Sequence, residues 1–362
     1  MERETTRAVG DASPPSAQSY GVEGQGEGRR RTANTFAARL MSYWTFMALV
    51  ILLVTFAFTA TNFYSRLNWI ATSTYATGFL ALSVGQTYVI ISGGIDLSVG
   101  GNLAMSGMAA AMAMRALENA GASDTALVLV GVAVGLLVGT AVGIANGILV
   151  ARVGITPIVV TLGTLGVTRG ATNLLNGGIE VANISPAFKQ FSRILGGWIT
   201  PLVLVSIVVA VVGGVVLAKT RFGLRTFALG SNREAARRAG INVADHLIRV
   251  YAICGFLAGL TGLMMVARFG VAETNLGQGA ELTSIAAVVI GGTSIFGGKG
   301  SVSGTIAGVA IMSALVTGLI LTNVQPFWQQ VATGGIIIAA VYIDRLRDRI
   351  QLRVHDTDGE FL

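Results

Sequence analysis

The sequence predicts an all-α, polytopic membrane protein with about ten transmembrane helices, some of them short or broken at glycine pairs. Of its 362 residues, 52% are hydrophobic and only 12% are charged, whereas soluble domains carry about 25% charged residues. Long windows without any charged residue recur along the chain, and a membrane helix needs about 20 mostly apolar residues. Basic residues gather in alternate segments between these windows, as the positive-inside rule requires. An ordinary soluble globular domain is therefore excluded.

Three regions differ in composition. Residues 1–39 are rich in Gly, Ser, Glu and Arg without hydrophobic periodicity, which predicts a disordered cytoplasmic tail. Residues 40–344 form the predicted transmembrane domain, and residues 345–362 form a cytoplasmic C-terminal tail. The apolar windows are 40–65, 67–95, 97–114, 125–151, 153–168, 194–218, 250–267, 282–298 and 300–343. The last window is long enough for two spans that break at 322–326.

The basic residues predict the orientation. With ten spans and the N-terminus inside, 19 of the 25 Lys and Arg residues lie on the inner side and 6 on the outer side. Both termini and the polar segment 219–249 then face the cytoplasm. The net charge of +7 follows from this inner-face bias and requires no nucleic-acid partner.

The segment 219–249 contains a short polar helix between two apolar windows. Ser231 and Glu234 have the spacing of a capping box, and Gly240 can close the helix in the left-handed conformation. The predicted contact residues are Ser231, Asn232, Arg233, Glu234, Ala235, Ala236, Arg237, Arg238 and Gly240. One interpretation is a basic loop that orients the membrane helices. The other is a docking surface, since small alanines permit close approach and arginines bind carboxylates.

Five stretches resemble a known family. The run from Glu234 to Gly240 resembles the E-A-A-x-x-x-G signature of ABC-transporter permeases. Residues 93–100, 155–164, 281–293 and 297–301 resemble motifs of the ribose-type (monosaccharide) permeases, and the similarity extends from about Trp69 to Tyr342.

This resemblance implies the permease subunit of an ATP-driven ABC importer for a monosaccharide or related small polar solute. The chain itself is then no enzyme and holds no cofactor, because ATP and Mg are bound by a partner ATPase. The other implied partners are an extracytoplasmic substrate-binding protein, a second permease chain and the lipid bilayer of the bacterial inner membrane. The sequence agrees with the expectation that ATP is bound by a partner, because the string most similar to a phosphate-binding loop, Gly298-Lys299-Gly300, lacks the required hydroxyl.

The alternative is a self-sufficient secondary transporter or channel, which usually needs ionisable groups at membrane depth. Asp96 is the only carboxylate between two long apolar windows, and it can equally cap the span that follows it. The candidate residues of a translocation path or gate are Asp96, Ser98, Thr156, Thr161, Thr164 and Asn173.

Glycines recur every four residues in the window 125–151. The stripe comprises Gly131, Gly135, Gly139, Gly143 and Gly147. It predicts either close helix packing or a surface that slides during transport. The single cysteine, Cys254, and two histidines are too few for a metal site, so no metal is expected and Cys254 is predicted to be a buried apolar residue.

Overall fold

The structure is a computed structural model that describes residues 46–325, 327–339 and 341–342. The described chain is helical apart from two isolated β-bridges. The predicted cytoplasmic tails 1–39 and 345–362 lie outside the described residues. The predicted all-helical class is confirmed for the part of the chain that is described.

A helix at Phe46–Thr59 opens the described chain, and another covers 327–339. Between them lie α2 (Arg66–Ile91), α3 (Val99–Asn119), α4 (Asp124–Ile148), η1 (Leu149–Val153), α5 (Pro157–Leu175), α6 (Pro186–Lys189), η2 (Gln190–Ser192), α7 (Pro201–Lys219), α8 (Arg221–Ser231), α9 (Arg233–Arg238), α10 (Val243–Phe269), α11 (Ala280–Ile290) and α12 (Val302–Leu321). Six described helices are long and apolar enough to cross a membrane: α2, α4 continued by η1, α5, α7, α10 and α12. The protein is therefore polytopic.

Each predicted window contains a helix, but the helices are unequal. The window 282–298 yields only α11, whose 11 residues extend about 16 Å. This length is about half the hydrocarbon thickness of a bilayer. A short helix is thus found at this place, in agreement with the predicted short or broken spans, because a glycine pair ends α11.

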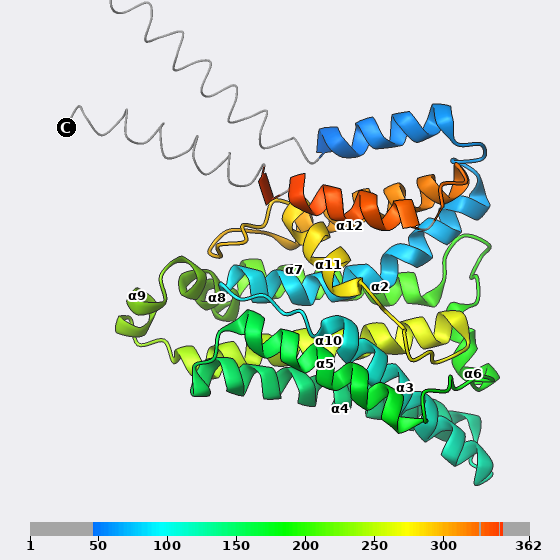
Figure 1. Cartoon of the computed structure of the whole chain (residues 1–362), viewed down its shortest axis with the longest axis horizontal. Helices are drawn as coiled ribbons and strands as arrows, with labels where there is room; N and C mark the ends of the chain where they lie inside the picture. The colour runs from blue at the N-terminus through cyan, green and yellow to red at the C-terminus, as the bar shows by residue number, and fades with distance from the viewer. Residues whose placement is uncertain (1–45, 326, 340, 343–362) are drawn as a thin grey trace, which may run out of the picture.

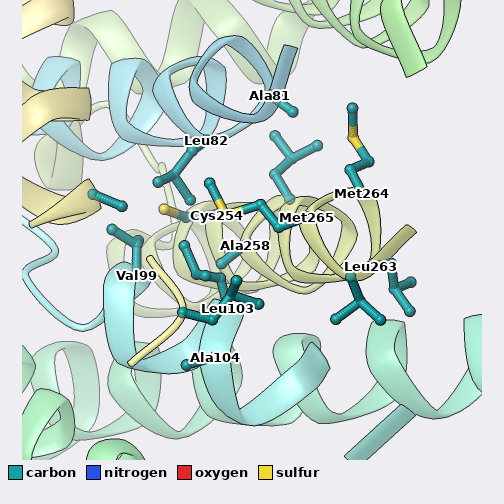
Figure 2. Close-up of a cluster of buried hydrophobic side chains, with 14 of the residues drawn as sticks. Ala81, Leu82, Val99, Leu103, Ala104, Cys254, Ala258, Leu263, Met264 and Met265 are labelled. Carbon is teal, nitrogen blue, oxygen red and sulfur yellow. The ribbon is translucent and has the colours of Figure 1, made fainter. Parts of the chain in front are cut away.

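The long helices run side by side, and α10 packs against α2, α3 and α4 at the centre (Figure 1). The short helices α8 and α9 lie at one end of the molecule, and α6 lies at the other (Figure 1). Cys254 of α10 is fully buried among apolar side chains that include Leu82 and Leu103 (Figure 2). It is a free thiol, as expected for a small buried apolar residue.

The glycine stripe of α4 is buried, mostly against α10. A Cβ atom on Gly139 would lie 2.5 Å from the carbonyl oxygen of Gly255, and one on Gly147 would lie 2.7 Å from the Cα of Ile248. Gly131 instead faces the side chain of Met114 on α3. The backbones of α4 and α10 therefore approach so closely that only glycine fits at Gly139.

Two helices, α2 and α11, end with the same backbone motif. Gly93 (φ 82°) and Gly292 (φ 86°) are both left-handed. The Gly94 N–H donates to Val89 O, and the Thr293 N–H donates to Val288 O in the same way. These are Schellman stops. Each is followed by a non-helical stretch and then a second helix, so the two segments are equivalent broken helices.

Candidate functional site

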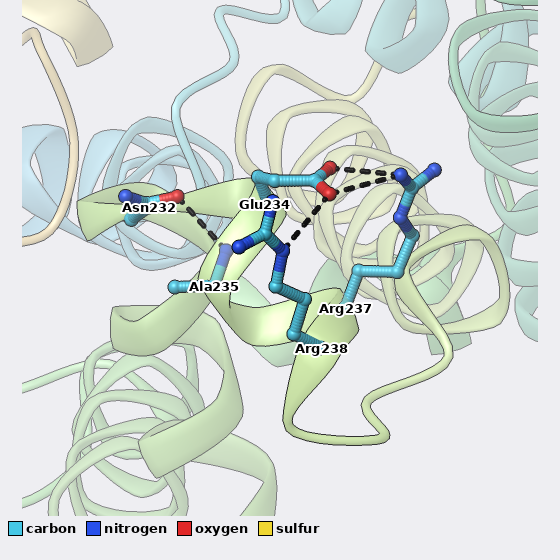
Figure 3. A network of polar contacts seen from close by, with 5 residues as sticks. All are labelled: Asn232, Glu234, Ala235, Arg237 and Arg238. Carbon is cyan, nitrogen blue, oxygen red and sulfur yellow. Dashed lines mark hydrogen bonds and ion pairs between the residues drawn. The ribbon is translucent and has the colours of Figure 1, made fainter.

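The polar helix of segment 219–249 is α9, and it begins one residue later than the capping box predicts. Ser231 is the last residue of α8, and Asn232 is extended (φ −159°, ψ 103°). Asn232 Oδ1 accepts a hydrogen bond of 2.9 Å from the Ala235 N–H (Figure 3). Asn232 is therefore the N-cap, and the assignment of that role to Ser231 is wrong.

The shift of register also changes the role of Glu234. A capping box needs its carboxylate at the third helical position, but Glu234 is the second residue of α9. Its carboxylate instead pairs with Arg237 at 2.9 Å and with Arg238 at 3.4 Å (Figure 3). The predicted end of the helix is found as expected, since Gly240 is left-handed with φ 80°.

Only part of the predicted alanine face is accessible. Ala236 is 4% exposed and packs against Leu229 and Leu247, which fixes α9 to α8 and α10. Ala235 and Ala239 are exposed. The accessible surface of α9 therefore consists of two alanines and its exposed arginines.

Positive charge dominates this end of the molecule. The segment 219–249 carries more basic than acidic residues, and its only carboxylates are those of Glu234 and Asp245. Glu234 is engaged within α9, and Asp245 pairs with Arg152 at 3.3 Å. Arg225 and Arg249 line a small cavity of about 120 Å³, and among the described residues neither forms an ion pair. The surface can therefore bind carboxylates of another molecule.

A cluster of glycines connects α8 and α9 with both broken helices. We call Gly93, Gly230, Gly297 and Gly298 the glycine junction. The Gly298 N–H donates a 2.9 Å hydrogen bond to the carbonyl of Ile91 at the end of α2. A Cβ atom on Gly230 would overlap that same carbonyl, and one on Gly297 would lie 3.0 Å from the Cα of Gly93.

Gly230 of the junction lies just before α9 in the chain, since only Ser231 and Asn232 separate it from that helix. The glycine pairs stand out in the sequence, but sequence reasoning misses Gly230 and this contact. An isolated glycine at the end of a short helix is the only signal.

Asp96 lies in the non-helical stretch after the first break and is 1% exposed. Its Oδ1 accepts hydrogen bonds from the Ser98 N–H (2.8 Å) and the Ser98 hydroxyl (2.6 Å). The first backbone bond of α3 runs from the Asn102 N–H to Ser98 O. Ser98 thus occupies the N-cap position, and Asp96 holds the turn before it instead of capping α3.

Ser98 continues this cluster towards α4 and α5. Its hydroxyl accepts from Asn146 Nδ2 at 2.8 Å, and Asn146 Oδ1 accepts from the Thr164 hydroxyl at 2.7 Å. The Thr161 hydroxyl donates to the carbonyl of Ile95 at 3.2 Å. Sequence reasoning misses Asn146, because a single asparagine on a glycine-rich helix gives no pattern.

The other two path candidates lie apart from this cluster. Thr156 is exposed at the start of α5, and its side chain makes no capping bond. Asn173 is exposed near the far end of α5, where its amide donates to Arg169 O at 2.9 Å. The Asp96 cluster is therefore a hydrogen-bond network that joins α4 and α5 to the stretch before α3. It contains Asp96, Ser98, Asn146, Thr161 and Thr164 and leaves out Thr156 and Asn173.

The matching family model and the relatives named below are all described as permeases. Residues 66–341 match the family described as the branched-chain amino acid transport system permease component. The D-allose transport system permease protein AlsC of Escherichia coli is 36% identical over 315 residues, which cover 86% of this chain and 94% of the relative. No solved structure matches the chain.

Two further relatives are named for other sugars. The galactose/methyl galactoside import permease protein MglC of Salmonella typhimurium is 33% identical over 83% of this chain and 93% of its own. The ribose import permease protein RbsC of Bacillus subtilis is 39% identical over 73% of this chain and 80% of its own.

Proposed function

The chain belongs to the family of ABC-importer permease components, and on that premise we propose that it carries a monosaccharide or related small polar solute into a bacterial cell. It is a multi-pass membrane permease without an ATPase domain of its own. The relatives named for allose, galactose and ribose, at 33–39% identity, support a sugar over a branched-chain amino acid.

The observation that carries the proposed mechanism is the exposed basic helix α9. It presents Ala235, Ala239 and its arginines at one end of the bundle, where a separate ATPase subunit can dock. ATP and Mg are bound by that partner and not by this chain. Closure of the ATPase moves α9, and this motion changes which side of the membrane the path opens to.

The glycine junction supplies the route for this motion. Gly230 is clamped between the end of α2 and the loop after α11, so a shift of α8 and α9 displaces both broken helices together. Broken helices with freed backbone groups are a common device of transporters. The proposed path and gate residues are Asp96, Ser98, Thr156, Thr161, Thr164 and Asn173.

A second permease chain completes the assembly along α5. A Cβ atom added to Gly163, Gly166 or Gly170 of this helix would meet no other atom within 4 Å, so these glycines leave an open strip on its outer side. Exposed aliphatic side chains of α5, among them Leu162, Val167 and Leu174, border this strip. Open glycine strips favour helix association in membranes, so we place the partner permease, identical or a sister chain, at α5.

The remaining parts of the proposal concern topology. Both termini and α9 face the cytoplasm, and an extracytoplasmic substrate-binding protein delivers the solute at the opposite end, near α6. A self-sufficient secondary transporter is disfavoured, because Asp96 is bonded within a hydrogen-bond network and the family is one of ABC-importer components.

A bulky residue on α9 tests the docking role. Ala235→Trp should abolish solute uptake and association with the ATPase, because the exposed side chain prevents close approach, while the amount of folded protein in the membrane stays normal. Ala120→Trp is the matched control, since Ala120 is an exposed alanine at the turn between α3 and α4. Normal uptake and normal association in the Ala235→Trp variant would refute the role of α9.

A further inference from the structure

A cavity of about 530 Å³ lies far from α9, between the start of α2 and the ends of α10 and α12. We call it the Arg268 cavity. It is lined by Asn62, Ser65, Leu67, Asn68, Ala71, Tyr75, Arg268, Thr317, Ile320 and Leu321. Its volume lies within the usual range of ligand pockets, about 300–1,000 Å³. The proposed transport mechanism uses none of these residues.

The cavity lies at the depth of lipid headgroups. The helix α10 has 27 residues and starts beside α9, so it extends about 40 Å to Phe269. The hydrocarbon core of a bilayer is only about 30 Å thick. Arg268, in the last turn of α10, therefore lies near the membrane interface opposite α9 (Figure 1).

Arg268 is charged and has no acidic partner among the described residues. Its guanidinium lies 5.8 Å from the ring centre of Tyr75 and 5.1 Å from that of Phe269. Its one hydrogen bond, to Thr74 O, is long at 3.5 Å. The dipole of α10 favours a cation at this end, but the guanidinium still offers several free donors to the cavity.

Most other polar groups of the lining are already bonded within the protein. The Asn68 amide donates to Phe63 O, and Ser65 Oγ accepts from the Asn68 N–H. The Thr317 hydroxyl donates to Ser313 O. A sugar site needs several converging donors and acceptors, which these groups do not leave free. What remains is one cation, with the Asn62 amide and the Tyr75 hydroxyl near it, beside a mostly apolar wall.

One cation beside an apolar wall fits an amphiphilic anion. We propose that the Arg268 cavity binds an anionic phospholipid, with the phosphate at Arg268 and an acyl chain along Leu67 and Ala71. Basic side chains near a membrane interface attract anionic lipid headgroups. The bound lipid joins the start of α2 to the ends of α10 and α12, and it thereby stabilises the end of the bundle opposite α9.

Phosphatidylglycerol is the probe for the test. The full chain is reconstituted in phosphatidylcholine nanodiscs with increasing phosphatidylglycerol, and retained lipid is counted by native mass spectrometry beside the thermal midpoint. Wild type should retain phosphatidylglycerol saturably and melt at a higher temperature with it. Arg268→Gln should weaken this binding at least about tenfold, as expected for loss of a charged hydrogen bond.

Two further variants keep the proposal falsifiable. Ala71→Trp fills the apolar side of the cavity and leaves the charge in place, so it should abolish retention of the lipid. This variant tests the cavity independently if Arg268→Gln does not fold. Arg66→Gln is the matched control, because Arg66 lies at the same end of α2 but donates to Gly197 O and stacks on Trp198. It should bind phosphatidylglycerol like wild type.

Three results would overturn the proposal. They are equal phosphatidylglycerol binding in wild type, Arg268→Gln and Ala71→Trp, an equal effect of phosphatidylcholine alone, and displacement of the lipid by ribose or galactose. The last result would identify the cavity as a solute site.

Discussion

At the scale of single residues, the buried carboxylate of Asp96 acts as an acceptor for both donors of Ser98. The carbonyl oxygen of an asparagine can accept the same bonds, whereas leucine leaves two buried donors unpaired. Each unpaired buried group costs about 1–3 kcal/mol. We therefore expect Asp96→Asn to keep most of the uptake and Asp96→Leu to lower the free energy of unfolding by about 2–6 kcal/mol, the cost of two such groups.

Thermal melting of the purified variants, with uptake in cells, checks this expectation. A variant Ser98→Ala serves as the control, because it removes one donor and its link to Asn146 while the carboxylate stays. Loss of uptake in Asp96→Asn with an unchanged melting temperature would instead give the charge a direct role in transport.

Residue types predict where a helix ends more reliably than they predict which residue caps it. Gly240 is predicted as a left-handed stop and is one. Ser231 and Asn232 are both good N-cap residues, so sequence alone does not choose between them. The structure chooses Asn232, because the packing of Gly230 against Ile91 holds Ser231 in the last turn of α8.

At the scale of elements, the contact between α4 and α10 depends on glycine. A methyl group on Gly139 would lie 2.5 Å from Gly255 O and 2.7 Å from the Gly259 Cα, so the two backbones must separate. Overpacking of this kind costs about 1–3 kcal/mol. We expect Gly139→Ala to reduce the yield of folded protein and to lower its melting temperature.

Gly163→Ala is the matched control for this prediction, since nothing lies within 4 Å of its added methyl group. Alanine favours helix over glycine by about 1 kcal/mol, so the single chain should be as stable as wild type or more so. If both alanine variants melt alike, the close approach of α4 and α10 does not limit stability.

Helix positions follow from hydropathy, but the breaks do not. Every predicted window holds a helix, because long apolar runs admit little else in a bilayer. Hydropathy alone passes over the end of α11, since the window 282–298 is apolar beyond Gly291 and Gly292, but the glycine pair itself marks the stop in the sequence. The sequence predicts four side chains of the Asp96 cluster and misses Asn146, because a single asparagine on a glycine-rich helix gives no pattern.

At the scale of the whole molecule, the distribution of basic residues predicts that both chain ends face the cytoplasm. Nineteen of the 25 Lys and Arg residues lie on the predicted inner side. A reporter that works only in the cytoplasm should therefore be active when fused after Leu362. Activity at the C-terminus of a reporter that works only outside the cytoplasm would contradict this topology. In that case α9 could not meet a cytoplasmic ATPase.

The last prediction concerns what the chain can do alone. Its described helices include six able to cross a membrane, and its sequence contains no phosphate-binding loop. We expect vesicles with the purified chain alone to show neither ATP hydrolysis nor saturable high-affinity sugar uptake. Addition of the matching ATPase and binding protein should restore both activities, and Ala235→Trp should abolish this restoration. Proton-driven uptake by the chain alone, lost in Asp96→Asn, would instead establish a secondary transporter, because only then would the buried carboxylate carry the coupling ion.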